Sequence, residues 1–530
     1  MRLKALFGEN SIKIATIILV ATLFLSNILG VLRDHFLAQK IPTDLLDTYF
    51  TAFRLPDLVF NVIILGAVSA AFVPIFSGYL AVGDREKAYT FANKIISTCL
   101  VVVLFVVLIM FIFMPNLIQL IAPHFNDDKI NLTISLSRLL LLSPIIFTFS
   151  YFFSGMLNSS KKFLVTSLSP LFYNLSIILS VYFLADRFGV FSAVYGVIFG
   201  AIIHATIQIF PLKNLGYKFK VLISFFDKEV VKMVRLMLPR SIGLGANQLM
   251  LVGFTSIASG LSGGAIAIYS LADNSQTMPT VVFGASVATA LFPTLSQFAT
   301  LGNKDEISRY LQKAIISILF YLIPASVAII LLRIQIVRLV LGSGNFGWEQ
   351  TIITADTLGM FAVSLVFSGL IPLFAKTFYA YKNTKIPTVI AIISIIISLI
   401  FGWFLSQSMG VIGLALAFSI GSLINAGILF IYLLELVDNI DFRIISIQTA
   451  KIIISSVAMA IALQWAKTLV GLNFDLTHGI EVLYQLLSAS IIGASMYFFC
   501  AWLLEFDKAK LKFISMLQFL LKLNFSNKKR

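Results

Sequence analysis

Charged side chains stand within an apolar stretch of the chain that runs from Leu25 to Tyr79. This stretch carries Arg33, Asp34, Asp47 and Arg54, although its other residues would suit a lipid bilayer. An ionised side chain near the bilayer centre costs roughly 2.5–3.5 kcal/mol on insertion scales. Such groups persist where they face a partner or a water-filled cavity, so each is a candidate functional residue. The stretch therefore predicts a pair of helices that line a polar cavity inside a membrane transporter.

The spacing of these residues predicts where their side chains point. Asp47, Thr51, Arg54 and Leu58 recur at helical intervals, so the acid and the base are expected on one face of a helix. Pro56 is expected to interrupt that helix and to free backbone groups that a cavity or a neighbouring helix must satisfy. A structural ion pair between Asp47 and Arg54 is the alternative to a substrate-binding role.

Two further pairs of polar residues are candidates for the site. Arg33 and Asp34 either contact substrate or form a helix-end pair whose side chains extend to the outer interface of the bilayer. Asp273 and Asn274 stand in the middle of an apolar span, which favours a role in a cavity.

Covalent and metal chemistry have no sequence support. The sequence has no nucleophile motif, nucleotide-binding loop or cysteine cluster, so we expect neither an enzyme nor a bound cofactor. Its two cysteines lie in separate apolar spans, and its four histidines lack metal-ligand spacing. The sequence therefore predicts no catalytic site, no cofactor site and no metal site. Transport would then draw on an ion gradient, the membrane potential or downstream consumption of the product.

The composition sets the class of protein. Of 530 residues, 59% are hydrophobic and 12% are charged, which is typical of an all-α polytopic membrane protein. Fourteen transmembrane helices are expected at approximately 12–33, 45–80, 92–115, 134–157, 163–185, 192–211, 231–259, 264–298, 310–333, 352–380, 387–408, 411–436, 444–468 and 482–505.

The net charge of +15 is explained by topology rather than by nucleic-acid binding. With the N-terminus in the cytoplasm, most of the 39 Lys and Arg residues fall on the cytoplasmic side. Both termini are therefore predicted to be cytoplasmic in a multi-pass protein. The basic tail at 511–530 would anchor this topology and touch anionic membrane lipid.

An internal repeat predicts the domain organisation. Ala71–Ile96 resembles Ala290–Ile315 at an offset of 219 residues, and Ser159–Phe163 echoes Asn383–Pro387. An offset of six helices keeps the orientation, so the repeat is parallel, with a pseudo-twofold axis along the membrane normal. The expected parts are an N-terminal lobe at 1–220 with helices 1–6, a C-terminal lobe at 221–440 with helices 7–12, and two extra helices, 13–14, at 441–510.

Several landmarks then carry a family resemblance from about residue 12 to residue 440. They keep their order along the chain: SNILGVLRD (Ser26–Asp34), LDTYFTAFRLPDL (Leu46–Leu58), AFVPIFSGY (Ala71–Tyr79), GMLNSSKKF (Gly155–Phe163), ALFPTLSQFATLGNKDE (Ala290–Glu306), FYAYKNTKIPT (Phe378–Thr388) and GLALAFSIGSLINAGIL (Gly413–Leu429). In these segments the chain resembles the MurJ/MviN family of lipid II flippases, within the multidrug/oligosaccharidyl-lipid/polysaccharide exporter (MOP) superfamily.

The resemblance implies a two-lobed transporter of peptidoglycan biosynthesis in the bacterial cytoplasmic (inner) membrane, required for cell wall biogenesis and cell shape. Its substrate would be the undecaprenyl-diphosphate-linked disaccharide-pentapeptide, moved from the inner to the outer leaflet by alternating access, and other cell-wall synthesis proteins would be its partners. An arginine fork matches phosphate oxygens bidentately. The substrate-binding positions implied or favoured are Ser26, Asn27, Arg33, Asp34, Asp47, Arg54, Asp273 and Asn274.

Departures from the family pattern mark a divergent member and leave other substrates open. Asn27 stands where the family usually has Arg, Asn274 where it has Arg after Asp, and Arg54 where it has Lys. An arginine pair and a Glu are replaced by Phe60, Asn61 and Leu65. For the sodium site of some members, only Asn425 matches loosely. The alternatives are a flippase for another polyprenyl-diphosphate-linked oligosaccharide, a cation-coupled exporter and a non-transporting scaffold.

Overall fold

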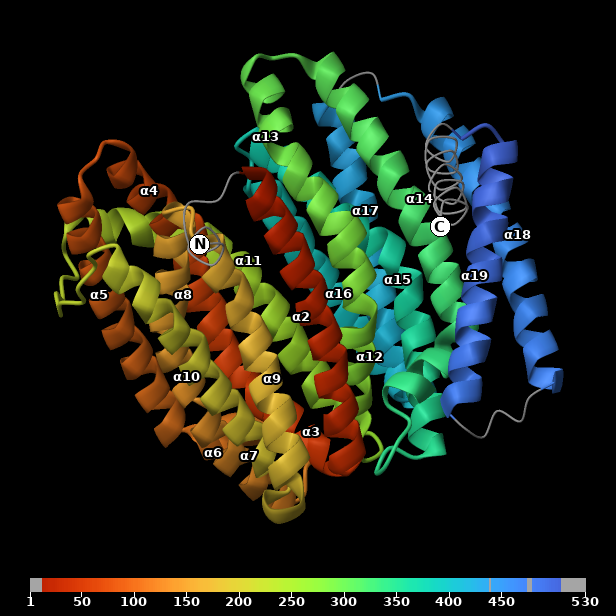
Figure 1. Ribbon diagram of the computed structural model, residues 1–530, viewed down its shortest axis with the longest axis horizontal. Coiled ribbons are helices and arrows are strands. Elements are labelled where there is room, and N and C mark those ends of the chain that lie inside the picture. The colour runs from red at the N-terminus through yellow and green to blue at the C-terminus, as the bar shows by residue number, and fades with distance from the viewer. Residues whose placement is uncertain (1–11, 438–439, 474–478, 507–530) are drawn as a thin grey trace, which may run out of the picture. The chain divides into compact units, whose positions relative to one another are not determined.

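The computed structural model describes residues 12–437, 440–473 and 479–506, and its regular structure within these ranges is helical throughout (Figure 1). The all-α expectation is confirmed. Within the same ranges, thirteen helical segments are long and apolar enough to cross a membrane. The predicted count of fourteen is not confirmed, because the segment expected as the first span lies in α2 (Ile12–Lys40), which is not among the thirteen. The basic tail at 511–530 lies outside the described residues.

The described chain forms two compact units. The first contains the described residues up to Leu271, together with Val340–Gln350 and Ala391–Leu414, and the second contains Ala272–Leu339, Thr351–Ile390 and the described residues from Ala415 onward. The predicted lobes at 1–220 and 221–440 stay a prediction.

The first unit holds the helices that carry most of the candidate residues. These are α2 (Ile12–Lys40), α3 (Thr43–Val59), η1 (Phe60–Leu65), η2 (Val68–Phe72), α4 (Val73–Ala81), α5 (Arg85–Ile112), α6 (Met114–Ile121), α7 (Asp127–Leu140), α8 (Leu142–Ser159), α9 (Phe163–Phe188), α10 (Phe191–Asn214), α11 (Lys228–Ala258), the start of α12 (Ala265–Pro279) and most of α16 (Lys385–Met409).

The second unit continues from the middle of α12. It holds η3 (Thr280–Ala285), α13 (Ser286–Thr300), most of α14 (Lys304–Val340), α15 (Trp348–Ala380), α17 (Val411–Leu436), α18 (Phe442–Asn473) and α19 (Gly479–Leu503). The two helices expected as C-terminal additions are α18 and α19. They pack on α14, where the Tyr497 hydroxyl donates to the Phe320 carbonyl at 2.7 Å and Gln335 donates to Gln485 at 2.9 Å.

Pro56 does not interrupt its helix at the position where an interruption was expected. Helix α3 continues through Pro56 to Val59, and the wider π-helical segment η1 follows it directly. A missing N–H removes one helical hydrogen bond, which a helix buried among neighbours tolerates. The Val62 carbonyl in η1 accepts a hydrogen bond from the Ser241 hydroxyl of α11 at 2.6 Å. π-Helical segments are rare and often mark functional sites.

The internal repeat is visible in the backbone. Gly83 (φ +80°) and Gly302 (φ +69°) turn the chain before α5 and α14, and their separation equals the 219-residue offset of the sequence repeat. The π-helical segments η1 and η3 begin 220 residues apart, at Phe60 and Thr280. The same local geometry therefore recurs in the two helices that the repeat equates.

The second sequence echo has a different register from the one expected. The left-handed residues after α8 and α15 are Lys161 (φ +58°) and Lys382 (φ +60°), which lie 221 residues apart. Aligning Ser159 with Asn383 placed the echo three residues too far along the chain. The sequence alignment matched similar turn residues in the wrong register, whereas the left-handed residues at the two helix ends define the correct register.

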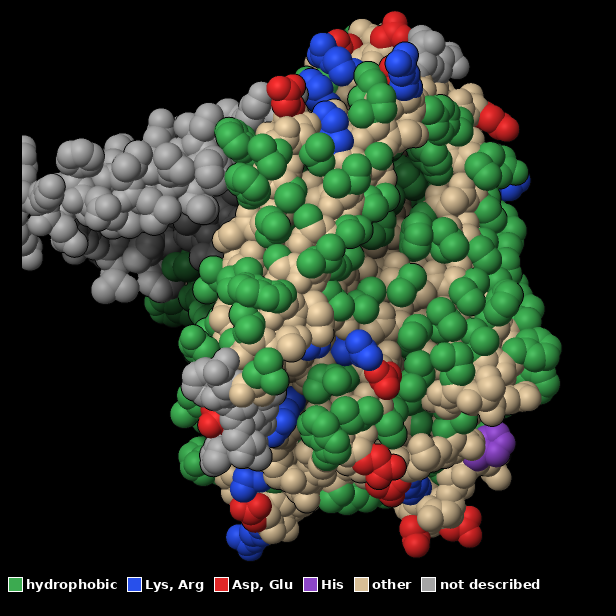
Figure 2. Space-filling view, turned by 90° about the vertical axis from the view of Figure 1, so that its right-hand side faces the viewer, with side chains coloured by type: hydrophobic (Ala, Val, Ile, Leu, Met, Phe, Trp, Pro, Cys, Tyr) green, Lys and Arg blue, Asp and Glu red, His purple; other side chains and the backbone are tan. Residues whose placement is uncertain are grey.

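Apolar packing holds each unit together. In the first unit, the ring of Phe72 stacks on Phe76 and Phe91 with centroids 5.4 Å and 5.7 Å apart and meets Phe152 edge-on at 4.8 Å. Hydrophobic side chains cover most of the upper and middle part of the face that carries α18 and α19, and charged side chains lie at its top and in its lower part (Figure 2). This distribution suits helices that cross a hydrocarbon layer.

Candidate functional site

The first group of predicted residues lies between α2 and α9. The Arg33 guanidinium donates to Asp34 Oδ1 through Nε at 2.9 Å and through Nη2 at 2.8 Å, and it also donates to Asn174 Oδ1 at 3.3 Å. Asn174 in turn reaches the Ser26 hydroxyl at 3.5 Å. Three of the predicted positions are therefore brought together, and Asn27 is half-buried beside Ser26 on α2.

Exposure separates the two charges of this pair. The Arg33 side chain is 24% exposed, whereas the Asp34 side chain is 7% exposed. Asp34 holds one edge of the guanidinium through Nε and Nη2, and Asn174 accepts from Nη1 at the other end. A half-buried guanidinium oriented by its own acid is a suitable ligand for a phosphate oxygen.

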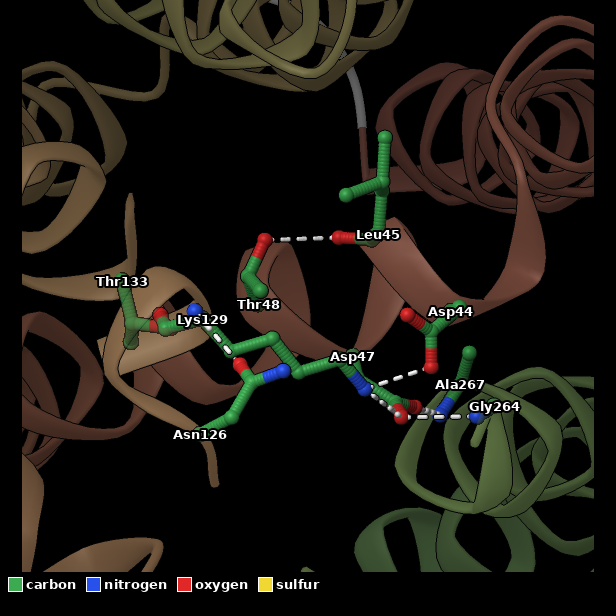
Figure 3. A network of polar contacts seen from close by, with 9 residues as sticks. All are labelled: Asp44, Leu45, Asp47, Thr48, Asn126, Lys129, Thr133, Gly264 and Ala267. Atoms are coloured by element: carbon green, nitrogen blue, oxygen red, sulfur yellow. Dashed lines mark hydrogen bonds and ion pairs between the residues drawn. The ribbon is translucent and has the colours of Figure 1, made fainter. Parts of the chain in front are cut away.

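The second group surrounds Asp47 at the start of α3 (Figure 3). The Asp47 carboxylate accepts hydrogen bonds from the backbone N–H groups of Gly264 at 2.7 Å and Ala267 at 2.9 Å. Lys129 of α7 reaches across to both acids of α3, with its Nζ 2.5 Å from Asp44 Oδ1 and 3.5 Å from Asp47 Oδ2. The Asp47 side chain is 3% exposed and that of Asp44 is 55% exposed.

Asp47 of α3 therefore caps the N-terminus of α12. Gly264 and Ala267 lie at the N-terminus of α12, where backbone N–H groups lack helical partners and carry partial positive charge. Gly264 has φ +89°, and a Cβ there would lie 2.9 Å from the side chain of Thr43, so the sequence needs glycine for the chain to approach α3 this closely. The substrate-binding role of Asp47 stays a prediction.

The third group surrounds Arg54, two turns farther along α3. Its Nε donates to the Thr255 hydroxyl of α11 at 2.8 Å and its Nη2 donates to the Ser270 hydroxyl of α12 at 3.3 Å. Asp47 and Arg54 both contact α12, so the prediction that they share one helix face is confirmed. Between them, the buried Thr51 hydroxyl has no hydrogen-bond partner within the described residues, which leaves a polar atom on this face.

Asp273 and Asn274 belong to the second compact unit. Gln276 donates to Asp273 Oδ1 at 2.8 Å, and the Ser364 hydroxyl of α15 contacts Gln276 Oε1 at 3.4 Å. The Asn274 side chain is exposed.

Sequence reasoning missed the partners of these charges. Asn174 left a signal, because it is an amide in the middle of an apolar helix. Lys129 stands in the acidic segment that begins α7, and Thr255 and Ser270 are small hydroxyl residues of a kind that is frequent in membrane helices. The backbone donors of Gly264 and Ala267 have no side-chain signature at all.

Outside the membrane-spanning segments, an ion pair fixes the start of α11. Asp227 caps this helix by accepting from the Glu229 N–H at 2.9 Å, and its other oxygen lies 2.6 Å from Lys94 Nζ. The hydrogen bond from Lys94 lowers the pKa of Asp227 below its usual range. Burial raises the pKa of Glu229, which accepts a hydrogen bond from the Tyr79 hydroxyl.

Similarity to known proteins extends over nearly the whole chain. Residues 42–485 match the family described as "Lipid II flippase MurJ". A probable lipid II flippase MurJ of Rickettsia prowazekii is 28% identical over 92% of this chain and 97% of its own length. The corresponding protein of Borreliella burgdorferi is 27% identical over 94% of this chain and 98% of its own length.

Solved structures agree with this assignment. A lipid II flippase MurJ in an inward closed conformation matches with a TM-score of 0.76 and 25% identity, over 92% of this chain and 98% of that one. A multidrug transporter of the MATE family in the MOP superfamily shares the fold, with a TM-score of 0.66, 16% identity and coverage of 77% of this chain. This multi-pass membrane protein belongs to the lipid II flippase MurJ family.

Proposed function

We propose that this chain moves lipid II from the inner to the outer leaflet of the bacterial cytoplasmic membrane, as a transporter with both termini in the cytoplasm. The observation that carries the proposal is the match to a solved lipid II flippase over 92% of this chain at 25% identity. The cationic groups inside the membrane spans add chemical support, since the substrate class carries a diphosphate.

Arg33 is the residue we assign to the first contact with the diphosphate. Its guanidinium is partly exposed and already oriented by Asp34 and Asn174, so little side-chain freedom is lost on binding. Arg54 is buried, and it donates to the hydroxyls of Thr255 and Ser270 within the same unit. Exchange of these hydroxyls for phosphate oxygens would strengthen both hydrogen bonds, because charge-assisted bonds are the stronger ones.

Asp47 has a different part in the proposed cycle. Its bonds to the N-terminus of α12 stabilise the conformation described above, so opening at this point must break two charge-assisted hydrogen bonds. Alternating access needs contacts that form in one state and part in the other. The contact between Asp47 and α12 suits that requirement.

The proposal includes no resident cofactor and no covalent step. Sodium coupling of the kind seen in some family members lacks a matching ligand set within the described residues. Asn425 contributes one buried amide oxygen without a hydrogen-bond partner there, but α16 and the membrane-spanning part of α11 (Arg240–Ala258) contain no acidic residue. We therefore derive no step through sodium.

Complementation tests the proposal. The chain is expressed in a bacterium depleted of its own lipid II flippase, and lipid II in the outer leaflet is measured directly. We expect the unaltered chain to restore outer-leaflet lipid II and Arg33→Ala to restore much less, whereas the exposed Arg187→Ala serves as the matched control. An inserted, folded chain that leaves lipid II in the inner leaflet would contradict the proposal.

A further inference from the structure

An apolar groove in the first unit lies apart from the charged groups described above. Helices α8 and α10 form its walls, and residues 216–219, which follow α10, close one end. Its volume is about 750 Å³, within the range of about 300–1,000 Å³ that ligand pockets occupy. Ile145, Phe149, Ile202 and Ile209 are among the side chains that line it.

Two lysines supply the charge of this groove. Lys213 lies in the last turn of α10 and Lys218 lies in the closing segment, and both side chains are exposed. Within the described residues neither lysine forms an ion pair, and no acidic side chain lines the groove. The groove therefore combines an apolar interior with a purely cationic end.

The closing segment is held in place by specific contacts. The Phe219 ring packs edge-on against Phe149 with centroids 5.6 Å apart. The Tyr217 hydroxyl donates to Asn93 Oδ1 of α5 at 2.7 Å, and Asn93 Nδ2 donates back to the Lys218 carbonyl at 3.2 Å. The backbone that carries Lys218 is thus fixed at the end of the groove.

The surroundings indicate a lipid rather than a water-soluble ligand. Both walls belong to segments long and apolar enough to span a membrane, Asp127–Ser159 and Phe191–Asn214. The chain that follows the closing segment exposes Phe225 at 46% and Phe226 at 95%, between Lys220 and Lys228. The acid between Phe226 and Lys228, Asp227, is paired with Lys94 of α5. Large apolar side chains beside basic ones are typical of a membrane interface that contains anionic lipid.

We propose that this groove binds a diacyl phospholipid with an anionic headgroup. An acyl chain lies along α8 and α10, and the phosphate sits between the ammonium groups of Lys213 and Lys218. The predicted topology puts this end of α10 at the cytoplasmic side, so the lipid belongs to the inner leaflet. The bound lipid is a resident of the N-terminal part of the protein and differs from the transported one, so the inference does not rest on the proposed function.

The test measures lipid binding by native mass spectrometry of the purified full chain. The probes are dioleoylphosphatidylglycerol and dioleoylphosphatidylcholine, which share their acyl chains and differ in net charge. We expect tighter binding of the anionic probe to the unaltered protein. The double variant K213Q/K218Q should bind it about 25-fold more weakly, at about fivefold for each lysine.

Matched variants separate the site from general surface charge. Lys220 is an exposed lysine that directly follows the closing segment and does not line the groove, so K220Q should keep the binding of the unaltered protein. Thr206 lines the groove with an exposed side chain, so T206F should fill the space and weaken the binding of both probes. Should the double variant fail to fold, K213Q carries the same test with an expected fivefold loss.

Four results would overturn the inference. The first three are equal binding of the two probes, unchanged binding in K213Q/K218Q, and an equal loss in K220Q, which would reduce the effect to diffuse charge. Addition of lipid II must leave the bound phosphatidylglycerol in place. Displacement would assign the groove to the transported lipid and would equally overturn the inference.

Discussion

Replacement of Asp47 tests the cap that α3 provides for α12. In Asp47→Ala the backbone N–H groups of Gly264 and Ala267 lose their acceptor in a buried place. Each buried donor left without a partner costs about 1–3 kcal/mol, so the pair predicts a loss of about 2–6 kcal/mol in the free energy of unfolding. Asp47→Asn keeps one carbonyl oxygen and should lose about half as much.

Asp44 provides the matched control. It pairs with the same Lys129, but its side chain is 55% exposed, so Asp44→Asn should cost less than about 1 kcal/mol. Thermal unfolding of the detergent-solubilised proteins supplies the measurement. The expected order of apparent midpoints is lowest for Asp47→Ala, then Asp47→Asn, with Asp44→Asn close to the unaltered protein.

Two outcomes would refute the reasoning. An Asp47→Ala midpoint equal to that of the unaltered protein would mean that the two backbone donors find other partners or water at no cost. A loss in Asp44→Asn as large as that in Asp47→Ala would place the stabilisation in the Lys129 ion pairs instead of the helix cap.

The other predictions concern the repeated turns, the start of α11 and the headgroup cation. Gly83→Ala and Gly302→Ala should each lower the free energy of unfolding by about 1–2 kcal/mol, because both positions have a left-handed backbone; unequal losses in thermal unfolding would deny their equivalence. The pKa of Asp227 is lowered by Lys94, so its contribution to stability is complete above the unfolded pKa of about 3.9 and is lost as the pH falls through the lower folded value. Asp227→Asn should therefore unfold with less dependence on pH below about 4, and an unchanged pH profile would contradict this assignment. Arg33→Lys keeps the charge but loses the fork, so it should bind lipid II about tenfold more weakly in a titration of the purified protein, and equal affinity would argue against bidentate contact.

The sequence predicted the helical spans well because a bilayer imposes a strong constraint. Every spanning segment needs a long apolar run, and such runs are read directly from composition. The repeat was also visible, because Gly83 and Gly302 occupy turns that favour glycine. The first span and the exact count of fourteen depend on α2, which begins at Ile12, the first residue that the structure describes.

Local geometry within a helix was predictable, but its interruption was not. Asp47 and Arg54 share a face because helical periodicity fixes it. Pro56 was expected to interrupt α3, yet neighbouring helices hold the chain helical and the change to π-helix comes at Phe60. The helices that pack against α3 and η1 are not part of this segment, so the segment's sequence alone could not predict that α3 continues through Pro56.

The partners of the charged residues could not be predicted. Arg54 and Thr255 are 201 residues apart, and Asp47 bonds to backbone groups 217 and 220 residues away. No periodic pattern links such positions, and a backbone N–H has the same chemistry in every residue except proline. Charged residues in apolar segments predict that a polar site exists, but only the tertiary structure identifies the groups that bind to them.

The central claim is that the arginines of α2 and α3, Arg33 and Arg54, receive the anionic headgroup of a lipid-linked substrate. Its most direct test is the affinity of the purified protein for lipid II, measured for the unaltered chain, for Arg33→Ala and Arg54→Ala, and for Arg187→Ala as the control. We predict that each of the two variants of α2 and α3 loses at least about tenfold in affinity, in line with one charge-assisted hydrogen bond, while the control binds like the unaltered chain. Equal affinity in all four proteins would contradict the claim.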